Sequence, residues 1–254
     1  MYYNDFEKCV ESGKNKIEFM KKSFFGYCIS SIMAGMYIGL AVILVNTIGT
    51  YIDSGIAKIF MGAGFSLGLC LVVICGAELF TGNVFFITSG VLDKKINILS
   101  GIKLLFICYI GNFIGSVMVS VLVFMGGILE NESIALFMNS SAVSKMLMSG
   151  NNIFFKAILC NMLVCLAVWS AMRCKSESGK IIMMFLCIFA FVVSGYEHCI
   201  ANMTLMTSVL ISNFSEGASV YGFIHNIIFS TLGNIVGGSI FVALPYYIIC
   251  KYKN

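Results

Sequence analysis

The chain has 254 residues, of which 59% are hydrophobic and 11% charged, and its mean hydropathy is +0.95. Soluble domains carry about 25% charged residues, so this composition excludes an ordinary soluble fold. The net charge is +4. Its lysines lie in short stretches between apolar runs, which is typical of membrane topology signals and excludes a nucleic-acid-binding surface.

The apolar runs are too long for strands, and the chain has a single proline. Because a bilayer requires backbone N–H and C=O groups to be bonded internally, the sequence predicts an all-α membrane protein. The 11 cysteines include no CxxC pair and lie mostly within apolar runs. This pattern favours buried thiols over a disulfide framework or a zinc site, so no metal and no cofactor are expected.

The first 22 residues precede the first apolar run and are rich in lysine. We expect residues 1–22 to form a cytoplasmic amphipathic helix, with an apolar face turned toward lipid or a neighbouring subunit: Phe6, Val10, Ile17, Phe19 and Met20. The apolar run that follows is long and lacks a small-residue cleavage site, so it is interpreted as a retained first helix.

Six membrane segments are predicted after this stretch: Gly26 to Ile48, Ile59 to Val91, Ile98 to Gly126, Ile153 to Ala171, Ile181 to Ile211, and Phe223 to Ile249. The second and fifth are longer than the roughly 20 residues that one span needs. Each is interrupted by polar residues and glycine, GAELFTGN at 76–83 and GYEHCIAN at 195–202. We therefore predict that both are broken helices.

The distribution of basic residues predicts the orientation. Thirteen of the 16 lie at the N-terminus, around the second-to-third and fourth-to-fifth connections, or at the C-terminus. Basic residues are enriched in cytoplasmic loops, so both termini are expected in the cytoplasm and the protein in a bacterial inner membrane.

An internal repeat relates the two halves. Glycine, glutamate and asparagine at 76, 78 and 83 recur at the same spacing at 195, 197 and 202. GNFIG at 111–115 is echoed by GNIVG at 233–237, and GLAVIL at 39–44 resembles CLAVWS at 165–170. With three segments per half, the second half enters from the opposite side, so residues 23–128 and 129–254 form an inverted repeat within one channel domain.

Two helix breaks at membrane depth favour an anion path. Backbone groups freed by a break must be satisfied by protein or by a water-filled cavity, and half-helices that begin there direct N–H groups and partial positive charge toward it. Simple kinks between packed helices are the alternative for either break alone. The Gly111/Gly115 and Gly233/Gly237 pairs are packing signals first.

His198 lies within the second break and is the leading candidate for a functional side chain, since ionisable residues at membrane depth are usually functional. A neutral packing histidine is the alternative. Polar residues of the two breaks are expected to act as a hydrogen-bonding scaffold: Glu78, Asn83, Glu197 and Asn202. The other membrane asparagines, Asn112, Asn161 and Asn234, are interpreted as contacts between helices, and His225 as structural.

Three motifs resemble the formate/nitrite transporter family: VICGAELFTG at 73–82, CNMLVCLAVW at 160–169 and GYEHCIANM at 195–203. The resemblance covers essentially the whole chain and implies an aquaporin-like six-helix protomer in a homopentamer, with one pore through each protomer. It also implies roles for eight residues: His198 as the central pore histidine, Thr81 as the threonine on the mobile loop of the second segment, Leu79, Phe80 and Phe191 at an outer or central constriction, Phe65 at an inner one, Lys145 in a vestibule and Asn161 along the pore.

The function predicted is a passive channel for a small monovalent anion, in which the anion is protonated or strongly hydrogen-bonded near His198 and crosses the apolar constrictions as a near-neutral species. Hydrosulfide is favoured over formate and nitrite, on a resemblance to clostridial-type members and an anaerobe-like composition. A neutral-solute channel of the aquaporin type is the alternative, although its paired NPA motifs are missing. A membrane metalloenzyme using Glu78, Glu197 and His198 is less favoured, because a second nearby histidine is lacking.

Overall fold

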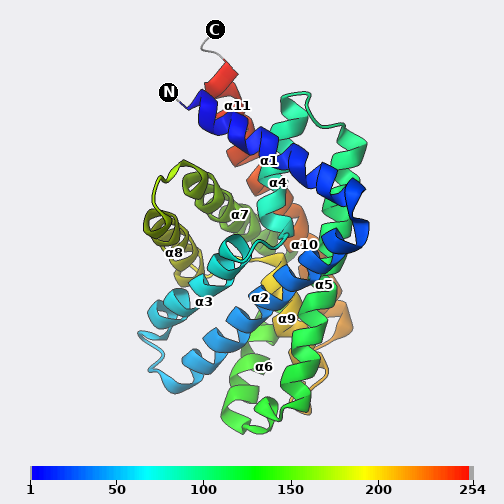
Figure 1. The fold of residues 1–254 in the computed structure, drawn as a ribbon. Coiled ribbons are helices and arrows are strands. Elements are labelled where there is room, and N and C mark those ends of the chain that lie inside the picture. Colours follow the sequence, from blue (N-terminus) through cyan, green and yellow to red (C-terminus); the bar gives the residue numbers. More distant parts are fainter. Residues whose placement is uncertain (1, 252–254) are drawn as a thin grey trace.

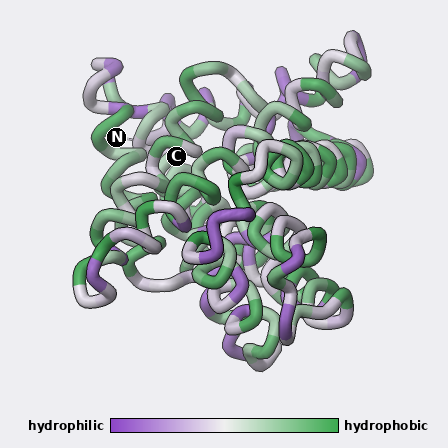
Figure 2. The backbone as a smooth tube through the Cα atoms, turned by 90° about the horizontal axis from the view of Figure 1, so that it is seen from below, coloured by the Kyte–Doolittle hydropathy of each residue, from purple (hydrophilic) through white to green (hydrophobic). Residues whose placement is uncertain are grey.

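A computed structural model describes residues 2–251, and within this range every regular element is helical. Five stretches are long and apolar enough to cross a bilayer: α2 (Phe24–Tyr51), α3 (Ala57–Ile74), α5 (Ile98–Met125), α7 (Gly150–Arg173) and the continuous stretch Val220–Cys250. The last of these contains α10 (Val220–Gly238), the π-helical turn η2 (Ser239–Ala243) and the beginning of α11 (Leu244–Lys251). Hydrophobic residues prevail along the long helices (Figure 2).

Shorter helices complete the chain. They are α1 (Tyr3–Lys22), α4 (Phe80–Leu92), the 3₁₀ turn η1 (Ile128–Glu130), α6 (Glu132–Met146), α8 (Glu177–Val193) and α9 (Cys199–Leu210). Several helices begin at a side chain that accepts a backbone N–H of the first turn: Asn97 for α5, Ser149 for α7, Ser176 for α8 and Ser219 for α10. Such caps satisfy N–H groups that have no partner within the helix.

The long segments predicted at 59–91 and 181–211 each contain two helices. α3 is followed by α4, and α8 by α9, with residues 75–79 and 194–198 lying between them. Just after the end of α3 and of α8, a glycine adopts a left-handed conformation: Gly76 with φ 75° and Gly195 with φ 68°. The following N–H groups, of Ala77 and Tyr196, bond back to carbonyls five residues earlier. This is the Schellman ending, in which glycine is favoured because it has no Cβ.

Two pairs of long helices, α2 with α5 and α7 with α10, pack closely through small residues. Gly111 and Gly115 of α5 lie against α2, and Gly233 and Gly237 of α10 lie against α7. A Cβ at any of these four positions would collide with the facing helix. The packing role predicted for the GxxxG pairs is therefore confirmed.

The N-terminal helix does not turn its apolar face to lipid or to another subunit. Phe6, Val10 and Ile17 are buried within the protein, and α1 packs mainly against α4. Phe19, also assigned to this face, is 39% exposed. The expected environment was wrong, because α4 and the chain end supply apolar surface that the sequence pattern could not locate. Figure 1 shows α1 and α6 at opposite ends of the helices.

Candidate functional site

We call residues 75–79, between α3 and α4, the first break, and residues 194–198, between α8 and α9, the second break. The first break is organised around Glu78. Its carboxylate accepts a hydrogen bond from Asn83 Nδ2 at 2.7 Å and pairs with Lys16 Nζ of α1 at 2.7 Å. A buried carboxylate is tolerated only when an opposite charge and hydrogen bonds replace its hydration. The scaffold role predicted for Glu78 and Asn83 thus gains a third member, Lys16, which the sequence analysis did not identify.

The second break repeats this arrangement. Glu197 accepts from Asn202 Nδ2 at 2.6 Å and pairs with Lys145 Nζ of α6 at 2.6 Å. The Glu197 side chain is only 2% exposed, whereas that of Lys145 is 23% exposed. Lys145 was expected in a vestibule by resemblance, and here it also neutralises a buried carboxylate.

Two asparagines bond to the backbone between α3 and α4 and between α8 and α9. Asn112 Oδ1 accepts from Phe80 N, and its amide donates to the carbonyls of Ser31 and Glu78. Asn234 makes the equivalent bonds in the other half: it accepts from Cys199 N and donates to the carbonyls of Ala157 and Glu197.

These side chains link helices, as predicted, but they also satisfy the backbone at both breaks. The interpretation of Asn112 and Asn234 as interhelical contacts alone was therefore incomplete. Their distance along the chain from residues 78–80 and 197–199 hid this second role.

Thr81 and His198 meet between the two breaks, with Thr81 Oγ1 and His198 Nε2 3.1 Å apart. His198 is the N-cap of α9, where its Nδ1 accepts from Ala201 N at 3.2 Å. Because that contact needs a lone pair on Nδ1, the neutral ring carries its proton on Nε2 and donates it to Thr81. The hydroxyl proton of Thr81 is then free to point elsewhere.

Two cavities approach this pair from opposite ends of the protein. The α6-side cavity has a volume of about 310 Å³, and its lining includes Phe65, Lys145, Phe191, Glu197 and His198. The α1-side cavity has a volume of about 500 Å³, and its lining includes Lys16, Leu69, Glu78, Leu79 and Lys180.

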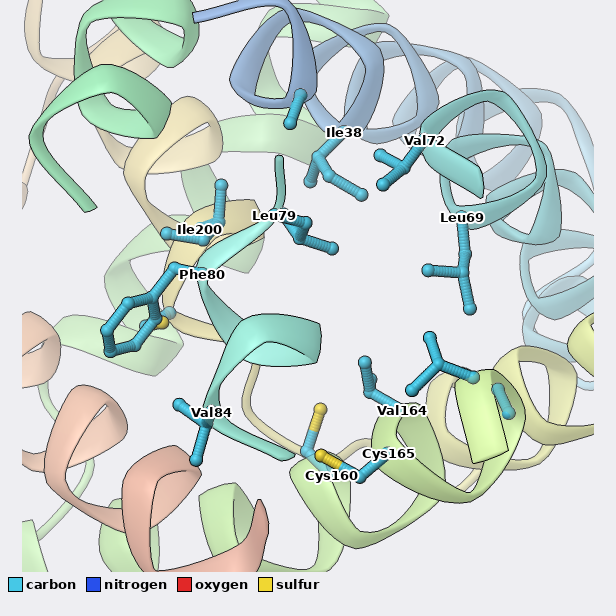
Figure 3. Packing of buried hydrophobic residues seen from close by; sticks show 14 of the residues in the cluster. Ile38, Leu69, Val72, Leu79, Phe80, Val84, Cys160, Val164, Cys165 and Ile200 are labelled. Carbon is cyan, nitrogen blue, oxygen red and sulfur yellow. The ribbon is translucent and has the colours of Figure 1, made fainter. Parts of the chain in front are cut away.

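The residues that separate the cavities are apolar. Phe65 and Phe191 pack edge to face with ring centroids 5.5 Å apart, and Phe191 also stacks on His198 at 6.0 Å. Figure 3 shows Leu69, Leu79 and Val164 directed toward one another from α3, the first break and α7.

The grouping of Phe65 and Leu79 differs from the one that the resemblance implies. Phe65 was expected apart from Phe191, but the two rings touch and line the same cavity as Lys145. Leu79, expected on the side of Phe191, lines the opposite cavity. The aromatic ring of α3 reaches α8 because these helices pack against each other.

Phe80 and Asn161 line neither cavity. Phe80 is buried against Tyr109, with ring centroids 4.9 Å apart. Asn161 of α7 donates to the carbonyls of Thr81 and Asn234, and so links the start of α4 to α7 and α10. The structure therefore places both beside the Thr81–His198 pair as packing and support.

A metal-binding arrangement of Glu78, Glu197 and His198 is not formed. Glu78 lines the α1-side cavity, while Glu197 and His198 line the α6-side cavity. Within residues 2–251 no three His, Cys, Asp or Glu side chains are grouped closely enough to hold a metal ion. The other histidine, His225, bonds through Nε2 to the carbonyl of Met148, consistent with a structural role.

Comparisons with known proteins agree with this geometry. The sequence profile described as Formate/nitrite transporter matches residues 3–248. The nitrite transporter NirC of Escherichia coli (strain K12) is 38% identical over 254 residues, which is 100% of this chain and 94% of that protein.

Two solved structures are also similar. An FNT family ion channel superposes with a TM-score of 0.92 at 36% identity, covering 97% of this chain and 98% of the other. A pentameric formate channel with formate bound superposes with a TM-score of 0.79 at 31% identity, covering 90% and 98%. These relatives are transporters and channels, and the apolar helices make this chain a multi-pass membrane protein. The chain belongs to the formate/nitrite transporter family.

Proposed function

We propose that the chain forms a pore for small monovalent anions of the nitrite and formate kind. One observation carries the proposal: two matching helix breaks bring Thr81 and His198 together between cavities that open at opposite ends of the protein. Nitrite and formate are the anions named for similar proteins. Hydrosulfide, which the sequence favoured, stays a prediction, since the similar proteins described above are named for nitrite or formate.

In this proposal α3 with α4 and α8 with α9 are each one broken span, and the protomer has six spans in an inverted, aquaporin-like 3+3 repeat. The repeated Glu–Asn–Lys arrangement and the matching asparagines Asn112 and Asn234 support such a relation. Residues 1–22, 23–128 and 129–254 then form one channel domain.

We further propose that five copies assemble, as the similar formate channel is pentameric. In this proposal the protein lies in a bacterial inner membrane with both termini in the cytoplasm. The basic residues near the α1 end support this orientation. The α6-side cavity then opens outward.

The physical steps follow from the site. Lys145 is paired with Glu197 but is the more exposed partner, so its ammonium group attracts anions at the mouth. The N-termini of α4 and α9 direct partial positive charge toward the breaks. The apolar residues Phe65, Phe191 and Leu79 exclude a hydrated ion, because an unpaired charge loses several kcal/mol or more of solvation there. The anion therefore crosses as a near-neutral species that shares a proton beside His198.

Flux into proteoliposomes tests the function. Nitrite, formate, hydrosulfide and chloride are compared side by side, each at several pH values. The flux of nitrite and of formate should be well above the flux into protein-free vesicles and should increase at acid pH. Chloride is the anion of a strong acid, so its flux should show neither effect. Chloride entering as fast as nitrite would mean an open aqueous pore, and no flux above the vesicle background would refute the channel.

A further inference from the structure

Two lysines in the α6-side cavity have no carboxylate partner. Lys58 of α3 and Lys156 of α7 line this cavity together with Lys145 of α6. Lys145 is neutralised by Glu197 at 2.6 Å. Neither Lys58 nor Lys156 forms an ion pair with any residue in the range 2–251. Three ammonium groups against one carboxylate leave two positive charges unbalanced.

The α1-side cavity lacks this excess. Its two lysines are both paired, Lys16 with Glu78 at 2.7 Å and Lys180 with Glu177 at 2.8 Å. The second and third lysines of the other cavity therefore call for a separate explanation.

The α6-side cavity also offers neutral donors for an oxyanion. The hydroxyl of Ser141 and the amide of Asn46 belong to its lining. One Asn46 amide hydrogen is donated to the carbonyl of Val42, which leaves the second for a ligand, whereas the Ser144 hydroxyl is donated to the carbonyl of Ser141. Its volume of about 310 Å³ lies at the lower end of the ~300–1,000 Å³ range of small-molecule sites. Unpaired ammonium groups together with a hydroxyl and an amide in the lining of one cavity suit the phosphate or sulfate class of ligand.

We propose that the α6-side cavity binds a tetrahedral dianion, sulfate or hydrogen phosphate, between Lys58 and Lys156, and that the bound dianion blocks the pore. This inference rests on the proposed function. The dianion matches the two unbalanced charges. It cannot continue past Phe65 and Phe191, since the solvation cost of a charge in an apolar medium rises with the square of that charge. The site thus makes anion flux sensitive to the concentration of divalent oxyanions.

Inhibition of formate flux in proteoliposomes tests the proposal, with sulfate present on both sides of the membrane so that protein orientation does not matter. The monovalent methanesulfonate at matched ionic strength is the reference. Sulfate should inhibit the unmodified protein more strongly than methanesulfonate. In a K58Q/K156Q variant the inhibition constant for sulfate should rise about tenfold or more, and K58R/K156R should retain inhibition.

A charge-matched control is K95Q/K103Q, which removes two exposed lysines that line neither cavity. Its inhibition by sulfate should equal that of the unmodified protein. Equal inhibition of K58Q/K156Q and the unmodified protein would overturn the proposal, as would sulfate acting no better than methanesulfonate.

Calorimetric titration of sulfate into purified protein separates this inference from the proposed function. Binding that is lost in K58Q/K156Q supports the site even if no formate flux is found. Absence of sulfate binding to the unmodified protein overturns the inference while leaving the channel intact.

Discussion

At the scale of single residues, the site depends on side chains that replace missing backbone partners. Asn234 bonds one N–H and two carbonyl groups around the second break, and Asn112 does the same around the first. An asparagine suits this task because its amide both donates and accepts. The geometry of Thr81 and His198 therefore depends on residues that touch neither of them.

Replacing Asn234 by leucine should destabilise the protein strongly. Two buried backbone groups, the Cys199 N–H and the Glu197 carbonyl, would lose their partner, at about 1–3 kcal/mol each. Thermal unfolding of purified protein measures the loss. Asn152→Leu is the matched control, since Asn152 is exposed and its backbone N–H, rather than its side chain, bonds to Ser149. Similar melting temperatures for the two variants would contradict the role of Asn234.

His198 has two functions that substitutions can separate. It caps α9 through Nδ1 and meets Thr81 through Nε2. Asparagine is among the best N-cap residues but does not titrate, whereas phenylalanine can neither cap nor titrate. We expect both His198→Asn and His198→Phe to lose most anion flux and its pH response, with only His198→Phe also lowering the melting temperature. Retained flux and pH response in His198→Asn would restrict the histidine to capping.

Lys145 should act through its charge. Flux in Lys145→Gln should fall more at low than at high ionic strength, because salt screens attraction at the partly exposed cavity mouth. Lys145→Arg keeps the charge and serves as the control. A loss that is equal at both ionic strengths would assign Lys145 to the support of buried Glu197 alone.

At the scale of elements, α1 belongs to the body of the protomer. Phe6 contacts Trp169 of α7, with ring centroids 6.5 Å apart, and Tyr247 of α11 at 6.2 Å. Arg173 reaches Asp5 at 3.4 Å, and the hydrogen bond from Lys8, reinforced by Arg173, lowers the pKa of Asp5. Lys16 then links α1 to the first break. Local amphipathicity predicts such a helix but not its docking surface.

Undocking of α1 can be followed through Trp169, the single tryptophan of the chain. Phe6→Ala removes a buried ring, which should lower the stability of the packing around α1 by about 3–5 kcal/mol. Trp169, which is 2% exposed, should then gain access to water, and its emission should shift to longer wavelength. Tyr3→Ala, at a side chain that is 43% exposed, is the control. An unshifted spectrum in Phe6→Ala would show that α1 does not depend on this contact.

At the scale of the whole molecule, many large apolar side chains remain exposed on the outer faces of the protomer, among them Leu99, Phe106, Leu122 and Met125 of α5. Lipid covers such faces in a membrane protein, and a neighbouring subunit can replace lipid on part of them. The protomer alone has both cavities and the Thr81–His198 pair. Assembly is thus not needed to form the site.

Native mass spectrometry of the detergent-solubilised protein should give five times the 27.8 kDa mass of one chain. The reason is that the pentameric formate channel superposes over 90% of this chain. A monomer or dimer that persists in mild detergents and carries full flux after reconstitution would contradict the pentamer.

Particular residues show how far sequence reasoning reached. Gly76 and Gly195, singled out by their spacing to glutamate and asparagine, are left-handed and lie between two helices each. Thr81 and His198, assigned separately to the pore by resemblance, lie 3.1 Å apart. The resemblance grouped Leu79 with Phe191 and set Phe65 apart, whereas Phe65 shares a cavity with Phe191 and Leu79 lines the other, because the cavity that a residue faces depends on how whole helices pack.

Hydropathy and glycine spacing are properties of short segments, so the sequence was enough to predict a helical membrane protein with special backbone positions at Gly76 and Gly195. The partners at those positions are known only from the folded structure: Lys16 with Glu78, Lys145 with Glu197, and the asparagines Asn112 and Asn234 that bond the adjacent backbone. These contacts join residues 32 to 62 positions apart. Nothing local encodes such a pairing, since helix packing alone brings these residues within bonding distance.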